Sequence, residues 1–228
     1  MQGMELRLLG HAACALITPE RESLVIDPYE SGGFGGAMAY APITLASDWV
    51  ICSHQHLDHC ATHLLPGEPT LIEGEGSFGA FHIKRHEAAH DEYDGRRRGG
   101  MVDILEIVAD GVRVVHLSDV GQSPTRELVE AIGAPDVLLV PVGGFYTIGA
   151  AQAYEWSVRL GAKWIVPCHY ATPSCHLPIR GVEHFEAYFP SAAGGARRLD
   201  ESLFRVDNQR EPGLWVLPMT NEVFDMSS

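Results

Sequence analysis

His54-Gln55-His56-Leu57-Asp58-His59 follows, after Ser53, the segment Trp49-Val50-Ile51-Cys52, a short apolar run of the kind that forms a buried strand. A turn at the end of a strand can aim several side chains at one point, and borderline divalent metals accept imidazole and carboxylate ligands. A polar loop with chance histidines is the alternative interpretation. The close spacing of the histidines and the aspartate favours a metal site instead.

A metal site needs more ligands than one loop supplies, and polar residues at the ends of later strands could provide them. Asp119 comes shortly after the apolar run at residues 114–117, and His169 follows the run at residues 165–167. His90 is a further candidate upstream of both. Catalytic groups concentrate on loops that a rigid scaffold holds in place. We therefore expect these three residues to join the histidine-rich loop.

The predicted elements are β-rich at first and then alternate between strands and helices. We expect strands at residues 6–9, 13–18, 24–26, 49–52, 70–72, 81–84, 104–108, 112–117, 136–141, 164–167, 203–206 and 214–217, and helices at residues 125–132, 150–160 and 181–188. Asp110-Gly111 is a strong hairpin signal, and the glycine-rich residues 31–39 predict a mobile surface loop. Without repeats or a low-complexity linker, we expect one domain over residues 1–228, with two sheets and helices outside them.

The charge balance bears on the partners of the chain. Its 228 residues carry a formal net charge of -14, and hydrophobic residues make up 46%, enough for a sizeable core. Nucleic-acid backbones require a basic surface, so we expect no nucleic-acid partner. The basic cluster Arg96-Arg97-Arg98 is short and has acidic neighbours. A small-molecule substrate is the expected partner, and a homo-oligomer is left open.

The cysteines are scattered and show no C-x-x-C spacing; they are Cys14, Cys52, Cys60, Cys168 and Cys175. This pattern predicts reduced, mostly buried thiols in a cytoplasmic protein. The N-terminal residues lack the pattern of a signal peptide. No apolar run approaches the ~18 residues of a membrane span, so we expect no membrane partner.

The order of these residues resembles the ligand pattern of the metallo-β-lactamase superfamily: H-x-H-x-D-H, then a histidine, then an aspartate and a histidine that each follow a strand. The resemblance runs from about Leu9 to Tyr170. More narrowly, the chain resembles the bacterial branch related to ascorbate-6-phosphate lactonase. The matching segments are Leu9-Gly10-His11-Ala12, Ile26-Asp27-Pro28, Pro141-Val142-Gly143-Gly144-Phe145-Tyr146-Thr147 and Pro167-Cys168-His169-Tyr170. The resemblance implies an α/β fold built as a four-layer αββα sandwich.

The resemblance also implies a binuclear metal site. A first metal would be held by His54, His56 and His90, a second by Asp58, His59 and His169, and Asp119 would bridge the two. Asp58 and Asp119 would be the catalytic carboxylates. A carboxylate between two dications lowers their repulsion, and water shared by two metals becomes hydroxide near neutral pH.

The implied function is a metal-dependent hydrolase that cleaves an ester-like bond, a lactone or phosphodiester, of a small molecule with a metal-bridging hydroxide. Its cofactors would be two divalent ions, zinc first, with manganese, iron or nickel also compatible with histidine and aspartate ligands. Two departures from the family pattern bear on the site. Ser118 stands where a glycine usually precedes the bridging aspartate, and Cys168 stands where methionine is frequent and could soften the metal preference.

Several other polar residues have competing interpretations. His82 and His86 share strand parity with His90, but partly exposed strand histidines are more common than ligands. His11 fits a place near the site and a structural role equally well, and Asp27 resembles a structural aspartate that supports the histidine loop. Supporting or core packing is expected for His116, surface positions for His63, His176 and His184, and substrate contact or burial for Tyr146, Thr147 and Tyr170.

Two other functions stay open. A glyoxalase-type thioesterase usually carries an additional C-terminal helical region, whereas the tail after Tyr170 is short and partly strand-like. A non-catalytic metal-binding protein of the same fold is the rival from a different class. A site that had lost its activity should also lose ligands, so the complete ligand set argues against this rival.

Overall fold

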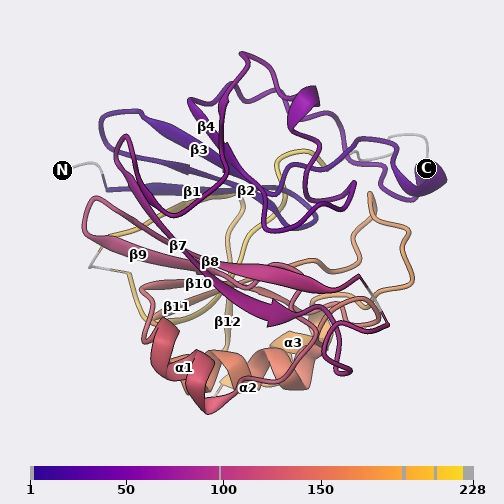
Figure 1. The fold of residues 1–228 in the computed structure, drawn as a ribbon. Helices are drawn as coiled ribbons and strands as arrows, with labels where there is room; N and C mark the ends of the chain where they lie inside the picture. Colours follow the sequence, from indigo (N-terminus) through magenta and orange to yellow (C-terminus); the bar gives the residue numbers. More distant parts are fainter. Residues whose placement is uncertain (1–2, 98, 192–193, 208–209, 223–228) are drawn as a thin grey trace.

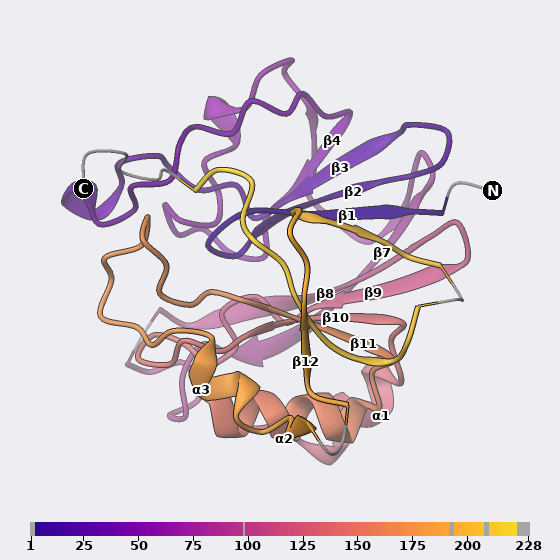
Figure 2. The same cartoon turned by 180° about the vertical axis from the view of Figure 1, so that it is seen from behind.

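Two β-sheets pack face to face, and the α-helices lie along the outer face of one of them (Figures 1 and 2). The computed structural model describes residues 3–97, 99–191, 194–207 and 210–222. Large apolar side chains such as Leu24, Phe81 and Val166 are fully buried in the core. Burying their surface is the main force that holds the sheets together. The predicted two-sheet α/β architecture is therefore present.

The first sheet has the strand order β13-β1-β2-β3-β4-β5. Its strands are β1 (Glu5–Gly10), β2 (Ala13–Ile17), β3 (Ser23–Ile26), β4 (Trp49–Ile51), β5 (Thr70–Ile72) and β13 (Leu203–Arg205). β3, β4 and β5 run parallel, so their carboxyl ends lie at one edge of the sheet. Asp27 follows β3 at this edge, and the histidine-rich loop follows β4.

The second sheet has the order β12-β14-β11-β10-β9-β8-β7-β6. Its strands are β6 (Gly76–Phe78), β7 (Phe81–Ala89), β8 (Met101–Ala109), β9 (Val112–His116), β10 (Val137–Pro141), β11 (Trp164–Cys168), β12 (Ala196–Arg198) and β14 (Gly213–Val216). β8 and β9 form the predicted hairpin, with positive φ at Asp110 and Gly111 as a primed turn requires. β9, β10 and β11 are parallel.

The α-helices are α1 (Arg126–Ile132), α2 (Ala150–Leu160) and α3 (Glu183–Glu186). The Thr125 hydroxyl caps α1 by accepting the backbone N–H of Leu128, and Gly161 ends α2 in the left-handed conformation. On the outer face of the first sheet, the described residues form loops and the short 3-10 turns η1 (Phe34–Gly36) and η2 (Thr62–Leu64) (Figure 1). Within the described part of the chain, α-helices thus cover only one side of the sandwich.

Several local expectations need correction. β6 and β12 were not expected, because short edge strands owe their form to pairing with a neighbour. Residues 31–39 form a surface loop as expected, with the Ala39 N–H donating to the Ser174 carbonyl at 2.8 Å, and the mobility of this loop stays a prediction. Cys52 and Cys60 form a disulfide, so the expectation of five reduced thiols is wrong. Among the described residues, no helix has the length and apolar character needed to cross a bilayer.

Candidate metal centre

Side chains from both sheets meet at the strand-end edge of the sandwich in two clusters. Within each cluster, the candidate ligand atoms lie within 4.8 Å of one another. One cluster contains His54, His56, His90 and Asp119, and the other contains His11, Asp58, His59 and His169. Every residue that the sequence placed in the metal site is included, in the same two groups. His11 is the addition.

Asp119 lies between the two clusters. Its Oδ1 is 3.0 Å from His59 Nε2 and 3.4 Å from His169 Nε2. Its Oδ2 is 3.5 Å from His90 Nε2 and 3.9 Å from His54 Nε2. One oxygen therefore faces each cluster, which is the arrangement a bridging carboxylate needs.

Buried polar atoms without hydrogen bonds test whether metal ions fit this site. Among the described residues, both ring nitrogens of His90 and His169 are buried without a hydrogen-bond partner. His59 Nε2 and Asp119 Oδ1 are also buried, and they lie 3.0 Å from each other. Leaving such atoms unsatisfied costs about 1–3 kcal/mol each. One nitrogen of each imidazole and one carboxylate oxygen are electron-pair donors of the kind that divalent ions bind, so the clusters fit the implied metals.

The electrostatics of the site also favour bound cations. Burial by itself would lower the pKa of His59, but the charges of Asp119, Asp58 and Asp27 raise it well above its usual value. The three carboxylates thus stabilise a positive charge at the position of His59. Burial lowers the pKa of His54 to about 4 and, with His11 nearby, that of His169 to about 3. Both are then neutral imidazoles at neutral pH, the form that binds metals.

Asp27 holds the histidine loop in place. Ser53 donates its backbone N–H to Asp27 Oδ1 at 2.7 Å and its hydroxyl to Oδ2 at 2.8 Å. His59 Nδ1 lies 2.9 Å from Oδ2. Burial acts to raise the pKa of Asp27, but the neighbouring His59 outweighs it and lowers the pKa to about 2. The carboxylate can therefore accept the Nδ1 proton and leave Nε2 aimed at the second cluster.

The contacts of Ser118 account for a serine at the position where the family usually has glycine. Its φ of 50° lies in the left-handed region, where glycine is normally favoured. The Ser118 hydroxyl donates to Asp27 Oδ2 at 3.1 Å, and its backbone N–H donates to His116 Nδ1 at 2.8 Å. His116 Nε2 in turn lies 2.9 Å from the Ala12 carbonyl oxygen. His116 therefore supports the turn that carries Asp119.

Residues just past strand ends in this site share a left-handed backbone. φ is 53° at His11, 49° at Asp27 and 50° at His169, as it is at Ser118. Non-glycine residues adopt this region at a cost, and such strain concentrates at functional sites. The bend ends each strand and turns the side chain toward the centre. A polar residue directly after an apolar strand was the available sequence signal.

The remaining candidates lie outside the two clusters. His86 Nε2 is 2.9 Å from Glu106 Oε2, and His82 Nδ1 is 3.1 Å from Ser77 Oγ. Both histidines lie on β7 and belong to neither cluster, as the greater frequency of partly exposed strand histidines led us to expect. Surface positions are confirmed for His63, His176 and His184.

The two residues that flank His169 in the chain, Cys168 and Tyr170, belong to neither cluster. Cys168 is buried but belongs to neither cluster, so nothing in the donor set softens the metal preference. The Tyr170 hydroxyl donates to the buried Leu217 carbonyl at 3.4 Å, which makes Tyr170 a core residue.

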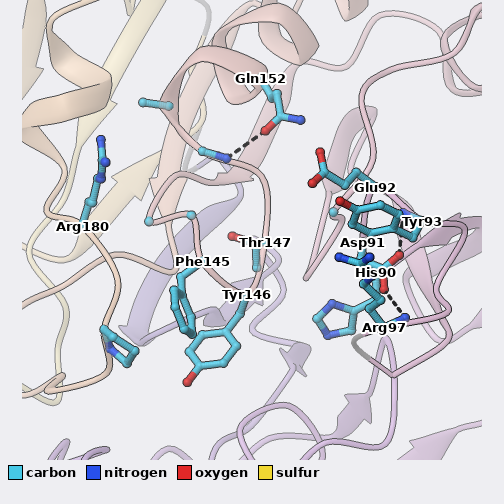
Figure 3. Close-up of a pocket in the computed structure, with 16 residues that line it drawn as sticks. His90, Asp91, Glu92, Tyr93, Arg97, Phe145, Tyr146, Thr147, Gln152 and Arg180 are labelled. Carbon is cyan, nitrogen blue, oxygen red and sulfur yellow. Dashed lines mark hydrogen bonds between the residues drawn. The ribbon is translucent and has the colours of Figure 1, made fainter.

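A cavity of about 500 Å³ opens over both clusters and is lined by His56, Asp58, His90 and Asp119. Apolar side chains that the sequence did not suggest also line it: Phe34, Leu57 and Leu177. A neighbouring cavity of about 650 Å³ adjoins it, and the two share His90, Phe145 and Tyr146 (Figure 3). Thr147 lines only the neighbouring cavity. Tyr146 and Thr147 thus lie where they can contact a substrate bound in these cavities.

Comparisons with known proteins agree with this geometry. A beta-lactamase superfamily domain model matches residues 5–169. A UPF0173 metal-dependent hydrolase of Methanoregula boonei is 30% identical over 194 residues, covering 74% of this chain and 83% of that protein. A Thermotoga maritima structure described as a Zn-dependent hydrolase of the metallo-β-lactamase superfamily has a TM-score of 0.73 at 31% identity, covering 94% of this chain and 97% of the other.

A more distant structure shares the fold. The isothiocyanate hydrolase from Delia radicum gut bacteria has a TM-score of 0.67 at 16% identity, covering 99% of this chain and 100% of the other. The predicted metallo-β-lactamase fold is confirmed, and the chain is a member of that superfamily of metal-dependent hydrolases. Within the superfamily, it belongs to the UPF0173 family.

Proposed function

We propose that this protein hydrolyses an ester-like bond, a lactone or a phosphodiester, in a small molecule. In this proposal His54, His56 and His90 hold one divalent ion, and Asp58, His59 and His169 hold a second, with Asp119 between them. His11 is proposed as an additional donor to the second ion. Two such ions would activate water and neutralise negative charge that develops on the substrate.

The observation that carries the proposal is the split contact of Asp119, with one carboxylate oxygen facing each cluster. Both oxygens are directed only at imidazoles of the two clusters, which is the arrangement expected for a carboxylate that bridges two ions. The cavity of about 500 Å³ opens on this carboxylate and on Asp58. Substrate bound there would lie directly against both clusters.

The chain's own residues have distinct tasks in this reaction. Asp27 orients His59 through Nδ1, and Ser118 and His116 hold the turn before Asp119. The Asp58 Oδ2 atom is 3.3 Å from His11 Nε2, which fixes the carboxylate at the cavity floor.

A neutral carboxylic ester or lactone is the preferred substrate within this class. Asp58 and Asp119 place negative charge at the cavity floor, and no lysine or arginine of the described residues lines that cavity. A phosphodiester would depend on the two proposed ions alone to offset its charge, because the described residues that line the cavity offer it no cationic side chain.

The test is turnover of matched panels of lactones and phosphodiesters, with metal content measured on the same samples. We expect lactone hydrolysis with two ions bound per chain, about 3.5–4 Å apart. Including ascorbate-6-phosphate lactone and a glutathione thioester tests the narrower resemblance and the thioesterase alternative. Two bound ions without turnover of any substrate would favour the non-catalytic metal-binding protein. At most one ion per chain after metal supplementation would contradict the two-metal site.

A further inference from the structure

The walls of the cavity above the clusters carry apolar side chains that are open to solvent. Phe34 is 49% exposed, and Leu57 and Phe145 are each 58% exposed. They come from separate loops, yet all line the same cavity. Single exposed apolar side chains are common on protein surfaces, but a group of them around one opening marks a binding site.

The backbone at both phenylalanines is unusual. φ is 53° at Phe34 and 64° at Phe145, in the left-handed region that bulky residues rarely adopt. Glycines stand on both sides of Phe34, and Gly144 precedes Phe145. Glycine would occupy either position without strain, and a polar residue would avoid exposing a ring to water. Neither stability nor solubility accounts for these rings, which points to a role in binding.

The charge of the lining residues limits the kinds of ligand that this cavity can bind. Its polar lining consists of cluster residues with Gln55 and Tyr146, and no cationic side chain of the described residues is among them. The neighbouring cavity is different, because Arg97 and Arg180 line it together with Asp91 and Glu92 (Figure 3). An anionic substituent would have its partners in that second cavity, and an apolar one would have them here.

We propose that Phe34, Leu57 and Phe145 form an apolar subsite that binds a neutral alkyl or aryl substituent of the substrate. This inference rests on the proposed function, since it assigns the part of the ester or lactone that does not react. The substituent lies between the rings while the reacting bond faces Asp58 and Asp119. The substrate class is then a small, uncharged ester or lactone with a hydrophobic tail.

The test uses 3-alkylcyclopentanones, which have the shape of γ-lactones but lack the ring oxygen and so have no bond to hydrolyse. Binding to the metal-loaded protein is measured by calorimetry for the unsubstituted ring and for propyl, pentyl and heptyl chains. We expect affinity to rise about fourfold per methylene until the cavity is filled. Because no turnover is required, binding with this trend supports the subsite even if no lactone is hydrolysed.

Phe34→Asn and Phe145→Asn are the informative variants, because asparagine tolerates the left-handed region and removes only the ring. Each should weaken binding of the heptyl ketone about five- to tenfold and leave the unsubstituted ring and the metal content unchanged. Thermal stability should not fall. The matched control is Val158→Asn on α2, where the side chain is 59% exposed and lines neither cavity. It should leave every affinity unchanged.

Several results would overturn the subsite. One is an affinity that does not depend on chain length, and another is an equal effect of Val158→Asn. Tighter binding of a ketone with a carboxylate-ended chain would assign the substituent to the neighbouring cavity with its arginines. Concentration-dependent dimers that Phe145→Asn abolishes would identify the apolar group as an interface between copies of the chain. Lactone turnover with no length dependence would preserve the proposed function and remove this inference.

Discussion

Asp119 is the residue on which the two clusters depend, since its oxygens lie 3.0 Å from His59 and 3.5 Å from His90. We expect Asp119→Asn to keep the fold and lose at least about 100-fold in activity, with reduced metal content. Asparagine has the shape of aspartate but no charge to offset two dications, an electrostatic loss of the size seen at other catalytic centres. Turnover and metal stoichiometry on the same sample measure both effects.

His86→Ala is the comparison for this variant, because His86 bonds to Glu106 and belongs to neither cluster. It should retain both ions and most of the activity, with a loss of about 0.5–1.5 kcal/mol in the free energy of unfolding. The ligand assignment is wrong if His86→Ala strips metal while Asp119→Asn keeps both ions and full turnover.

His11 should contribute to metal binding although it lies outside the family's ligand pattern. His11→Asn preserves the left-handed backbone but removes the imidazole. We expect the variant to hold the first ion normally and to bind the second more weakly, measured by elemental analysis across a metal titration. His176→Gln, on the surface, serves as the control. Two ions bound at unchanged affinity in His11→Asn would assign His11 a structural role.

Asp27 acts through His59 and Ser53, so its removal should damage the site indirectly. Asp27→Ala should lower metal affinity or activity about 10–100-fold, the usual effect of losing a residue that orients a ligand. Asp48→Ala is a matched control, because Asp48 also binds a serine, accepting the Ser23 N–H at 2.8 Å, but contacts no histidine. Equal metal affinity and activity in wild type and Asp27→Ala would contradict the supporting role.

At the scale of elements, the loop between β4 and η2 carries four cluster residues and is closed by the Cys52–Cys60 disulfide. The cysteines lie on either side of the loop, with a Cα–Cα distance of 5.4 Å. A cross-link of this span restricts the unfolded chain and keeps the loop near its folded path. The disulfide and Asp27 thus restrain the same short segment.

Replacing both cysteines with serine should lower the free energy of unfolding by about 2–3 kcal/mol, as loop-closure entropy predicts for so short a span. Denaturant titration with and without reductant measures this difference, and mass spectrometry of alkylated protein counts the free thiols. The reductant should have no effect on the double variant. Five alkylated cysteines in unreduced wild-type protein would show that the pair does not form in solution.

At the scale of the whole molecule, the clusters join both sheets, because their residues come from loops after β1, β4, β7, β9 and β11. The unfolded chain has no such site, so metal ions bind the folded state almost exclusively. Binding therefore stabilises the fold by mass action, by about 4 kcal/mol when free metal exceeds the dissociation constant a thousandfold.

Removal of metal by a chelator should lower the melting temperature by about 8–16 °C, which is the shift that about 4 kcal/mol produces in a domain of this size. Calorimetry before and after chelation measures the shift, and zinc or manganese should restore it. Asp119→Asn should show a much smaller shift. If chelation leaves the melting temperature of the wild type unchanged, the buried imidazoles and carboxylates do not depend on bound ions.

The sequence by itself indicated a metal site and named most of the residues that the fold brings together in the two clusters. His54, His56, Asp58 and His59 lie within six positions, and Asp119 and His169 follow apolar strands, so residue chemistry and local periodicity named these candidates and the family resemblance implied their grouping. The hairpin at Asp110-Gly111 was predictable for the same reason, because its turn depends on two neighbouring residues.

Only the tertiary structure decided how the distant segments meet. The donor role open to His11, the split contact of Asp119 and the Cys52–Cys60 pair each depend on distances between segments that local patterns do not contain. The same holds for Phe34 and Phe145, which are far apart in sequence and become walls of one cavity only when the sheets pack. Packing of the whole core sets these distances, since strand register and loop closure are non-local properties of the chain.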